Sequence, residues 1–168
     1  MRRSQDLTVC TSVSEFTAAI DSKVFAIAER RHKRHVTEYV NTTATLDIED
    51  YADAEDGYIY SIAVNIGGVN VDVRYIEDAF AIFDYLVDRF TLSPDRKLVI
   101  YVHNLGHEHY HMTQIMAPRY GNPEILLTKS TKPLLITYSN GLEFRDSFKL
   151  FQKSLAGATK GLLHAKLK

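Results

Sequence analysis

The order of apolar patterns between residues 58 and 102 restricts the folds that this chain can adopt. YIYSIAVNI (58–66) is predicted to be a long strand, and the Gly-Gly pair at 67–68 predicts a hairpin turn into VDVRYI. EDAFAIFDYLVDRF (77–90) repeats its apolar residues with a helical period. KLVIYV (97–102) is typical of a short buried strand. A hairpin, a helix and a further strand predict a sheet with helices packed against it.

The remaining segments extend this pattern. TATLDI (43–48) is predicted to be a strand that ends in acids, and EILLT and PLLITYS are predicted to form a second hairpin. Asn140-Gly141 is a turn signal before LEFRD. We expect two further helices, over AIAERRHKRH (26–35) and over 108–117 with a stop at Pro118, and partial helix in the basic C-terminal segment. The predicted fold is α/β, with a mixed sheet.

Composition indicates a cytoplasmic globular protein. The chain has 168 residues, 45% of them hydrophobic, which is enough for one domain with a core. It has no run of 18 or more apolar residues, and the basic N-terminus MRRSQDLTVCTSVSEF lacks the apolar centre of a secretory signal. The single cysteine, Cys10, cannot form an internal disulfide, which is typical of a reducing compartment. We therefore expect no membrane partner.

Charge is distributed unevenly along the chain. Residues 41–124 carry five basic and fourteen acidic side chains, a balance of −9, whereas residues 125–168 carry eight basic and two acidic, a balance of +6. The acidic part favours carboxylates gathered around cations, and the basic part favours a surface for polyanions. Solvated faces that segregate by sign would produce the same counts, because charge reports association tendency and not fold.

Two carboxylates end the strand TATLDI. Asp47 and Glu49 are two residues apart, so in a strand they project to the same side. Carboxylates so close repel each other unless a cation lies between them, and Mg²⁺ or Mn²⁺ is the natural partner of such oxygens. The alternative is a strand that runs into a solvated acidic loop, DIEDYADAED.

A second pattern, HEHYH, is a literal H-E-x-x-H from His107 to His111 and contains Glu108. In a zinc protease both histidines lie one turn apart on a helix, and a third ligand completes the site. Glu124 and Glu143 are the candidates for that ligand, although both lie in or beside predicted strands. The glycine before His107 also places this histidine at a helix end, and the zinc hypothesis leaves the D-x-E acids unused.

The two patterns together resemble a known family, the N-terminal 3′–5′ exonuclease domain of family B DNA polymerases, in the protein-primed branch of tailed phages. Its first motif, D-x-E on the first strand, is matched by Asp47 and Glu49. Its second motif, Y/F-x-H-N-L-x-(aromatic)-D/E, is matched by Tyr101, His103, Asn104, Leu105 and Glu108. GLEFRDSFKLFQKSLAGATKGL resembles the family's strand that carries Asp-Ser before a helix. The resemblance implies an RNase H-like (DnaQ-type) fold.

This chain departs from the family pattern at three points. Glu108 stands where many relatives have Asp, and His107 stands where they have an aromatic residue. The third motif, Tyr-x-x-x-Asp, and the polymerase palm and thumb are not found in the sequence. We therefore expect a basic lead-in at 1–40 and an exonuclease-like domain at 41–168 that is incomplete at its C-terminus. The expected partner is a polymerase chain that supplies the third motif, the palm and the thumb.

The resemblance also implies a mechanism. Asp47, Glu49 and Glu108 would hold two Mg²⁺ or Mn²⁺ ions, with Asp50 or Asp146 as a substitute for the missing acid. The 3′ end of single-stranded DNA would be bound by the remaining matched residues: Tyr101, His103, Asn104, Leu105 and Ser147. The function predicted is proofreading hydrolysis of phosphodiesters. Two alternatives stay open at this point: a non-catalytic module that binds single strands or docks on a polymerase, and the zinc protease.

Overall fold

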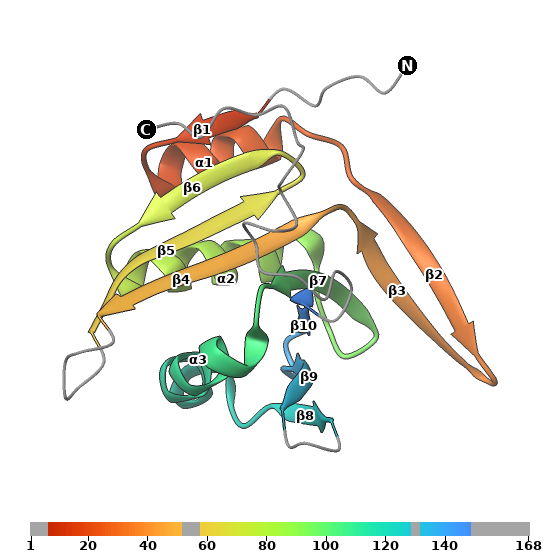
Figure 1. The fold of residues 1–168 in the computed structure, drawn as a ribbon. Coiled ribbons are helices and arrows are strands. Elements are labelled where there is room, and N and C mark those ends of the chain that lie inside the picture. The colour runs from red at the N-terminus through yellow and green to blue at the C-terminus, as the bar shows by residue number, and fades with distance from the viewer. Residues whose placement is uncertain (1–6, 52–57, 129–131, 149–168) are drawn as a thin grey trace, which may run out of the picture.

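The structure of the chain is a computed structural model that describes residues 7–51, 58–128 and 132–148 (Figure 1). Within these residues the chain forms ten strands and three helices. They follow in the order β1 (Thr8–Cys10), α1 (Val13–Asp21), β2 (Ala26–His32), β3 (His35–Asn41), β4 (Ala44–Tyr51), β5 (Tyr58–Ile66), β6 (Val69–Val73), α2 (Ile76–Phe90), β7 (Arg96–Val102), α3 (Leu105–Tyr120), β8 (Glu124–Leu127), β9 (Pro133–Thr137) and β10 (Leu142–Asp146).

The strands form one mixed sheet, in the order β1-β6-β5-β4-β7-β10-β9-β8, which β2 and β3 join through the pairing of β3 with β7. At its centre, β4 pairs antiparallel with β5, and β5 pairs antiparallel with β6. Strand β7 pairs parallel with both β4 and β10. A three-stranded meander followed by two parallel strands is the RNase H-like arrangement. The predicted α/β fold, with a mixed sheet flanked by helices, is confirmed.

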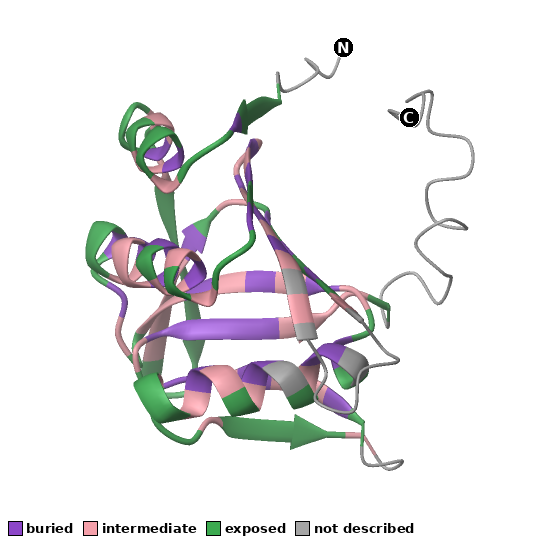
Figure 2. Ribbon diagram, turned by 90° about the vertical axis from the view of Figure 1, so that its left-hand side faces the viewer, coloured by how far each residue is buried: buried purple, intermediate pink, exposed green. Residues whose placement is uncertain are grey.

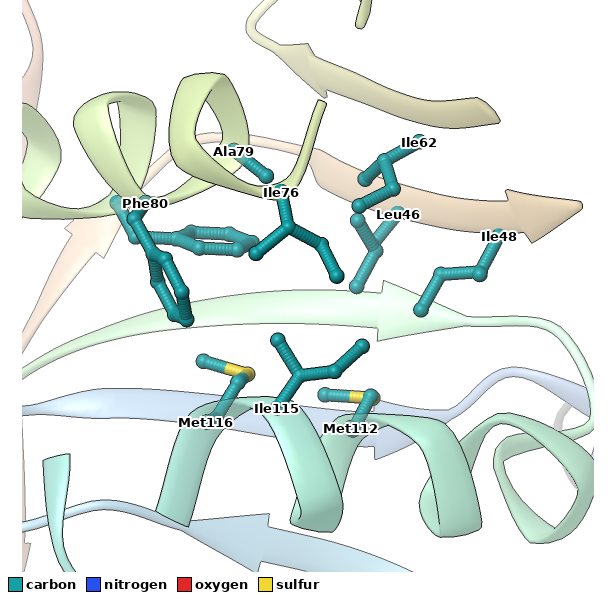
Figure 3. A pocket seen from close by; sticks show the side chains of 10 residues that line it. Leu46, Ile48, Ile62, Ile76, Ala79, Phe80, Met112, Ile115 and Met116 are labelled. Carbon is teal, nitrogen blue, oxygen red and sulfur yellow. The ribbon is translucent and has the colours of Figure 1, made fainter. Parts of the chain in front are cut away.

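Helices α2 and α3 lie on the same face of the sheet and form the core with it. The buried positions of α2 recur every three or four residues, as its apolar period predicts: Ala79, Ile82, Phe83, Leu86 and Phe90. Leu46 and Ile48 of β4 face α2 and Met112 and Met116 of α3 across an apolar cavity of about 20 Å³ (Figure 3). Buried positions follow the central strands and the inner sides of the helices (Figure 2). This apolar layer fixes which side chains of β4 face away from the helices.

The predicted hairpin turns are confirmed. Gly67 and Gly68 have φ values of 57° and 85°, which suit the two-residue turn between β5 and β6. Gly141 has φ 89°, and the backbone N–H of Leu142 donates to Asn140 Oδ1 at 3.2 Å. Strands β8 and β9 pair antiparallel, and so do β9 and β10. The Gly67-Gly68 and Asn140-Gly141 turns therefore specify their connections locally, whereas residues 129–131, between β8 and β9, lie outside the described residues.

The helix predicted over 26–35 is wrong, because this segment forms most of a hairpin. Strands β2 and β3 pair from Ala26 opposite Asn41 to His32 opposite His35, and the turn residue Lys33 has φ 55°. The hairpin is held at its base, where Tyr39 pairs with Lys97 of β7. The helical propensity of the basic residues is weak compared with this tertiary pairing.

Helix α3 begins three residues earlier and ends three residues later than predicted. It begins earlier because the backbone N–H of Leu105 donates to Asp146 Oδ1 at 3.4 Å, which caps the first turn. Pro118 lies inside the last turn instead of ending the helix. The hydroxyl of Tyr120 donates to Asp84 of α2 at 2.7 Å, so a contact between helices stabilises the turn after the proline.

The segment before residue 40 contributes strands to the same sheet: β1 pairs parallel with β6, and β3 pairs with β7. The domain boundary at residue 40 stays a prediction. The helix expected in the basic C-terminal segment falls at 149–168, outside the described residues. In the part of the chain that the structure describes, no helix has the length and apolar character needed to cross a membrane.

Candidate active site

The two acids of the D-x-E pattern lie on the face of β4 that points away from the helices. Leu46 and Ile48 are buried, whereas Asp47 and Glu49 are exposed, so the strand alternates strictly at these positions. Because Leu46 and Ile48 point into the core (Figure 3), Asp47 and Glu49 project together from the opposite face. We call this opposite side of the sheet the open face.

Tyr101 lies on the open face beside these acids. Strands β4 and β7 run parallel, with Thr45 opposite Tyr101 and Leu46 opposite Val102. Paired residues point to the same side of a sheet, so Tyr101 shares its side with Thr45 and therefore with Asp47. The parallel pairing also brings the carboxyl ends of β4 and β7 to one edge, where His103 and Asn104 follow β7 directly.

Glu108 approaches this edge from the first turn of α3. Its side chain is only 6% exposed, and its Oε2 atom is buried and has no hydrogen-bond partner among the described residues. Burial raises the pKa of Glu108 to about 7, and the charges of Asp47, Asp50 and Glu49 raise it in the same direction. The structure therefore couples the acid of the second motif to both acids of the first.

Carboxylates in this arrangement suit a hard divalent cation. Buried carboxylate oxygen without a donor is stabilised by positive charge, and Mg²⁺ and Mn²⁺ prefer oxygen ligands. Among residues 7–51, 58–128 and 132–148, however, no three His, Cys, Asp or Glu side chains lie close enough together to hold one ion. Asp47, Glu49, Asp50 and Glu108 are thus oxygen ligands of the type that such a metal prefers, and the metal site itself stays a prediction.

Asp50 and Asp146, the two substitute acids, have different surroundings. Asp50 is one of the charges that raise the pKa of Glu108, and it follows a register shift between Glu49 and Asp50 in the pairing of β4 with β5. Asp146 Oδ1 instead accepts the backbone N–H groups of Leu105, at 3.4 Å, and Phe148, at 3.0 Å. Asp50 is therefore the better candidate for an additional metal ligand, and Asp146 organises the start of α3.

The two substrate-binding segments meet beyond the ends of β7 and β10. Asp146 lies opposite Val102 in the parallel register, so Ser147 and His103 leave the sheet side by side. Ser147 Oγ lies 3.4 Å from His103 Nδ1, and the ring of Phe148 packs edge-on against that of His103 with centroids 5.6 Å apart. The two segments form one surface next to the acids.

Asn104 and Leu105 connect this surface to α3. Asn104 is exposed and adopts the left-handed conformation, with φ 60° and ψ 53°, which asparagine tolerates better than most residues. Leu105 is fully buried, and it anchors the helix start in the core. The role of both residues in substrate binding stays a prediction.

The candidate zinc ligands lie in three different elements, α3, β8 and β10. His107 and His111 both lie in α3, and their side chains are outside what the structure describes. Glu143 is 2% exposed and is bound to Lys97 Nζ at 3.0 Å and to Arg145 Nε at 2.7 Å. Glu124 belongs to β8, a strand whose residues are all exposed (Figure 2).

Sequence reasoning missed two parts of this region. Phe148 contacts His103, and its position directly after Ser147 was the only signal for it. The ion cluster of Lys97, Glu143 and Arg145 depends on the pairing of Glu143 with Val99, between β10 and β7, which no local pattern reveals.

Comparison with known proteins supports the fold. No family model matches the chain, and no curated protein matches it significantly. Two solved structures of a DNA polymerase, that of phi29, are similar to it. One is the post-translocation binary complex with primer-template DNA: TM-score 0.59, 10% identity, 76% of this chain and 24% of the polymerase chain. The other is the ternary complex with primer-template DNA and incoming nucleotide substrates: TM-score 0.50, 9% identity, 64% of this chain and 21% of the polymerase chain.

At this level of identity the likeness shows the shared fold. The chain spans about a quarter of the length of the polymerase chains that it matches.

Proposed function

We propose that this chain is a 3′–5′ exonuclease domain of the kind found in protein-primed family B DNA polymerases, acting on single-stranded DNA 3′ ends. The observation that carries the proposal is that the first motif, the second motif and the Asp146-Ser147 segment meet at one sheet edge. Parallel pairing sets Thr45 of β4, two residues before Asp47, opposite Tyr101 of β7. It also brings His103 and Ser147, which directly follow β7 and β10, side by side at the same edge. The similarity of the fold to phi29 DNA polymerase supports it.

Asp47, Glu49 and Glu108 would hold the divalent ions, and Asp50 is close enough to influence Glu108 electrostatically. When bound, Mg²⁺ or Mn²⁺ would supply a hydroxide nucleophile and stabilise the leaving 3′ oxygen. For this reaction the protein itself supplies carboxylates from two elements: Asp47 and Glu49 from strand β4, and Glu108 from the first turn of α3. Because their charges repel each other, a cation would draw these side chains together and deprotonate Glu108.

The terminal nucleotide would be held by the residues that surround the acids. Tyr101 presents an aromatic ring on the open face, on which a base can stack. His103, braced by Ser147 and Phe148, would accept a hydrogen bond from the terminal sugar hydroxyl, and the exposed Asn104 would donate one to the terminal phosphate. The proposal concerns this hydrolysis alone, because the match covers a quarter of the polymerase chain.

The test is hydrolysis of a 5′-labelled single-stranded oligonucleotide in Mn²⁺, which yields a ladder of products shortened from the 3′ end. Asp47→Ala should abolish the ladder. Asp88→Ala is the matched control, since it removes one exposed carboxylate from α2 and should leave the rate unchanged. A ladder that persists in Asp47→Ala would contradict the proposed site.

Two further outcomes identify the alternatives. DNA binding without cleavage by the wild-type chain, in Mg²⁺ or Mn²⁺, would assign the domain to single-strand binding. Stoichiometric zinc that is retained during dialysis and lost in His111→Ala would favour the protease hypothesis.

A further inference from the structure

The β2–β3 hairpin carries a basic tip away from the body of the protein (Figure 1). Residues 30–35 contain four basic side chains and two histidines with no acid among them, and all six are exposed. Arg30 makes no ion pair with any described residue, whereas His35 pairs with Asp95 at 3.2 Å. Strand β2 has β3 on one side and no described strand on the other. The exposed Arg30 is therefore available to a polyanion.

One side of the hairpin is continuous with the open face. Arg30 lies opposite Thr37, which shares its side with Tyr39, and Tyr39 lies opposite Lys97 of β7. Lys97 and Tyr101 are four residues apart on the same strand and therefore point to the same side. Arg30 thus faces the same way as Tyr101. Arg31 lies opposite Val36 and faces the other way.

Arginine and tyrosine side chains follow one another along this side. The guanidinium of Arg30 lies 5.1 Å from the centre of the Tyr39 ring, and that of Arg145 lies 5.8 Å from the same ring. Arg145 lies opposite Tyr101 in the pairing of β10 with β7. We call Arg30, Tyr39, Arg145 and Tyr101 the Arg–Tyr track. It leads from the hairpin to the edge where Asp47 projects.

We propose that the Arg–Tyr track binds the single-stranded DNA upstream of its 3′ end and guides it to the acids. The inference rests on the proposed function and names the path of the substrate on the same site. Alternating cations and aromatic rings suit a single strand, because phosphates meet the guanidinium groups and unpaired bases stack on the rings. Net positive charge here also offsets the repulsion between phosphates and the acids.

The length of the track sets a minimum length for the strand that uses it. Tyr39 lies opposite Lys97 and Thr45 lies opposite Tyr101, so the two levels are roughly 13 Å apart along β7. Arg30 and Asp47 lie two residues beyond these levels, which makes the whole path roughly 25 Å. A strand of about three nucleotides bound at the acids would not reach Arg30, and one of about twelve would.

The test is a comparison of Arg30→Ala with Arg31→Ala, which removes the same charge from the opposite side of the same strand. Affinity for fluorescent oligothymidylate of about three and about twelve nucleotides is measured by anisotropy in EDTA, where no cleavage occurs. Arg30→Ala should lower the affinity for the longer oligonucleotide about three- to tenfold. It should also reduce the magnitude of the slope of log K against log salt by about 0.7. Arg31→Ala should change neither the affinity for the longer oligonucleotide nor its salt dependence. Arg30→Ala should leave the affinity for the short oligonucleotide unchanged.

If both variants lose affinity for the longer oligonucleotide equally, or if Arg30→Ala loses none, the Arg–Tyr track does not bind the strand as proposed. A duplex bound as tightly as the single strand, with the same dependence on Arg30, would overturn its assignment to single strands. The result is independent of the exonuclease proposal, because binding is measured without metal. If Arg30→Ala weakens binding while the wild-type chain never cleaves DNA, the track stands and the catalytic proposal fails.

Discussion

Ser147 Oγ lies 3.2 Å from the carbonyl oxygen of Val102 and 3.4 Å from His103 Nδ1, and so joins the ends of β10 and β7. A hydroxyl has one proton to donate. If that proton goes to the carbonyl, Oγ can only accept from His103, which must then carry its proton on Nδ1. Nε2 of His103 would be left as an acceptor toward the substrate. Ser147 is therefore a positioning residue for His103.

Ser147→Ala should lower exonuclease activity by disturbing His103, while the fold is kept. The loss of one such hydrogen bond destabilises a protein by about 1 kcal/mol, which leaves the melting temperature within a few degrees of the wild-type value. Ser147→Thr keeps the hydroxyl and should restore most of the activity. The measurement is the cleavage rate on a single-stranded oligonucleotide together with its dependence on pH. If Ser147→Ala and Ser147→Thr lose exonuclease activity equally, the hydroxyl of Ser147 does not position His103.

Gly141 is predicted to be intolerant of any side chain, because it connects β9 to β10 against β7. Its φ of +89° is unfavourable for other residues, and a Cβ atom there would lie 2.6 Å from both Arg96 O and Ser93 N. Gly121 is the matched control, because its φ is +81° but a Cβ atom there would meet no described atom within 4 Å. Chemical denaturation should show a larger loss of unfolding free energy for Gly141→Ala than for Gly121→Ala.

The strongly patterned elements could be predicted from sequence alone. Strand 58–66, its Gly67-Gly68 turn and the apolar period of α2 each contain their own signal, because burial on one side imposes a period. The β2–β3 hairpin could not be predicted, because every residue of β2 is exposed and leaves no apolar period. Its conformation is fixed by pairing with β7, a contact distant in sequence.

Some residues of the candidate site could likewise be placed from the sequence, and others could not. Asp47 and Glu49 could be assigned to one side of a strand from their spacing. The position of Asp50 depends on the register shift after Glu49, and the use of Asp146 as a helix cap depends on the parallel alignment of β10 with β7. Neither feature has a local sequence signal, so Asp50 and Asp146 could not be told apart before the pairing of the strands was known.

The alternation of β4 predicts opposite effects for neighbouring substitutions. Leu46 is buried against α2 and α3 and lines the cavity of about 20 Å³, whereas Thr45 is exposed on the open face. Leu46→Ala should lower the free energy of unfolding by about 2–5 kcal/mol, because it enlarges an existing cavity. Thr45→Ala should change it by less than about 1 kcal/mol. If urea denaturation shows a similar loss of unfolding free energy for both variants, the assignment of Leu46 to the core and Thr45 to the open face is contradicted.

Glu108 should make the metal-free protein less stable as pH rises. Its pKa increases from an ordinary value of 4.5 to about 7 on folding, chiefly through burial and next through Asp47. Between these two values the unfolded chain loses the proton and the folded chain keeps it, so the free energy of unfolding falls as pH rises. Well above pH 7 this loss of unfolding free energy is complete, with an upper limit of about 3.4 kcal/mol.

Glu108→Gln removes this ionisation, so the variant should be more stable than the wild type at pH 8 in EDTA, by several degrees in melting temperature. At pH 4.5 the two proteins should differ little, because Glu108 is protonated in the folded wild type. Glu124→Gln, which removes an exposed carboxylate from β8, serves as the control for loss of charge. Adding Mn²⁺ at pH 8 should raise the melting temperature of the wild type more than that of Glu108→Gln, because the variant keeps Asp47 and Glu49 but lacks one of the three carboxylates proposed to bind the cation. A difference between variant and wild type that is the same at both pH values would show that Glu108 does not titrate in this range.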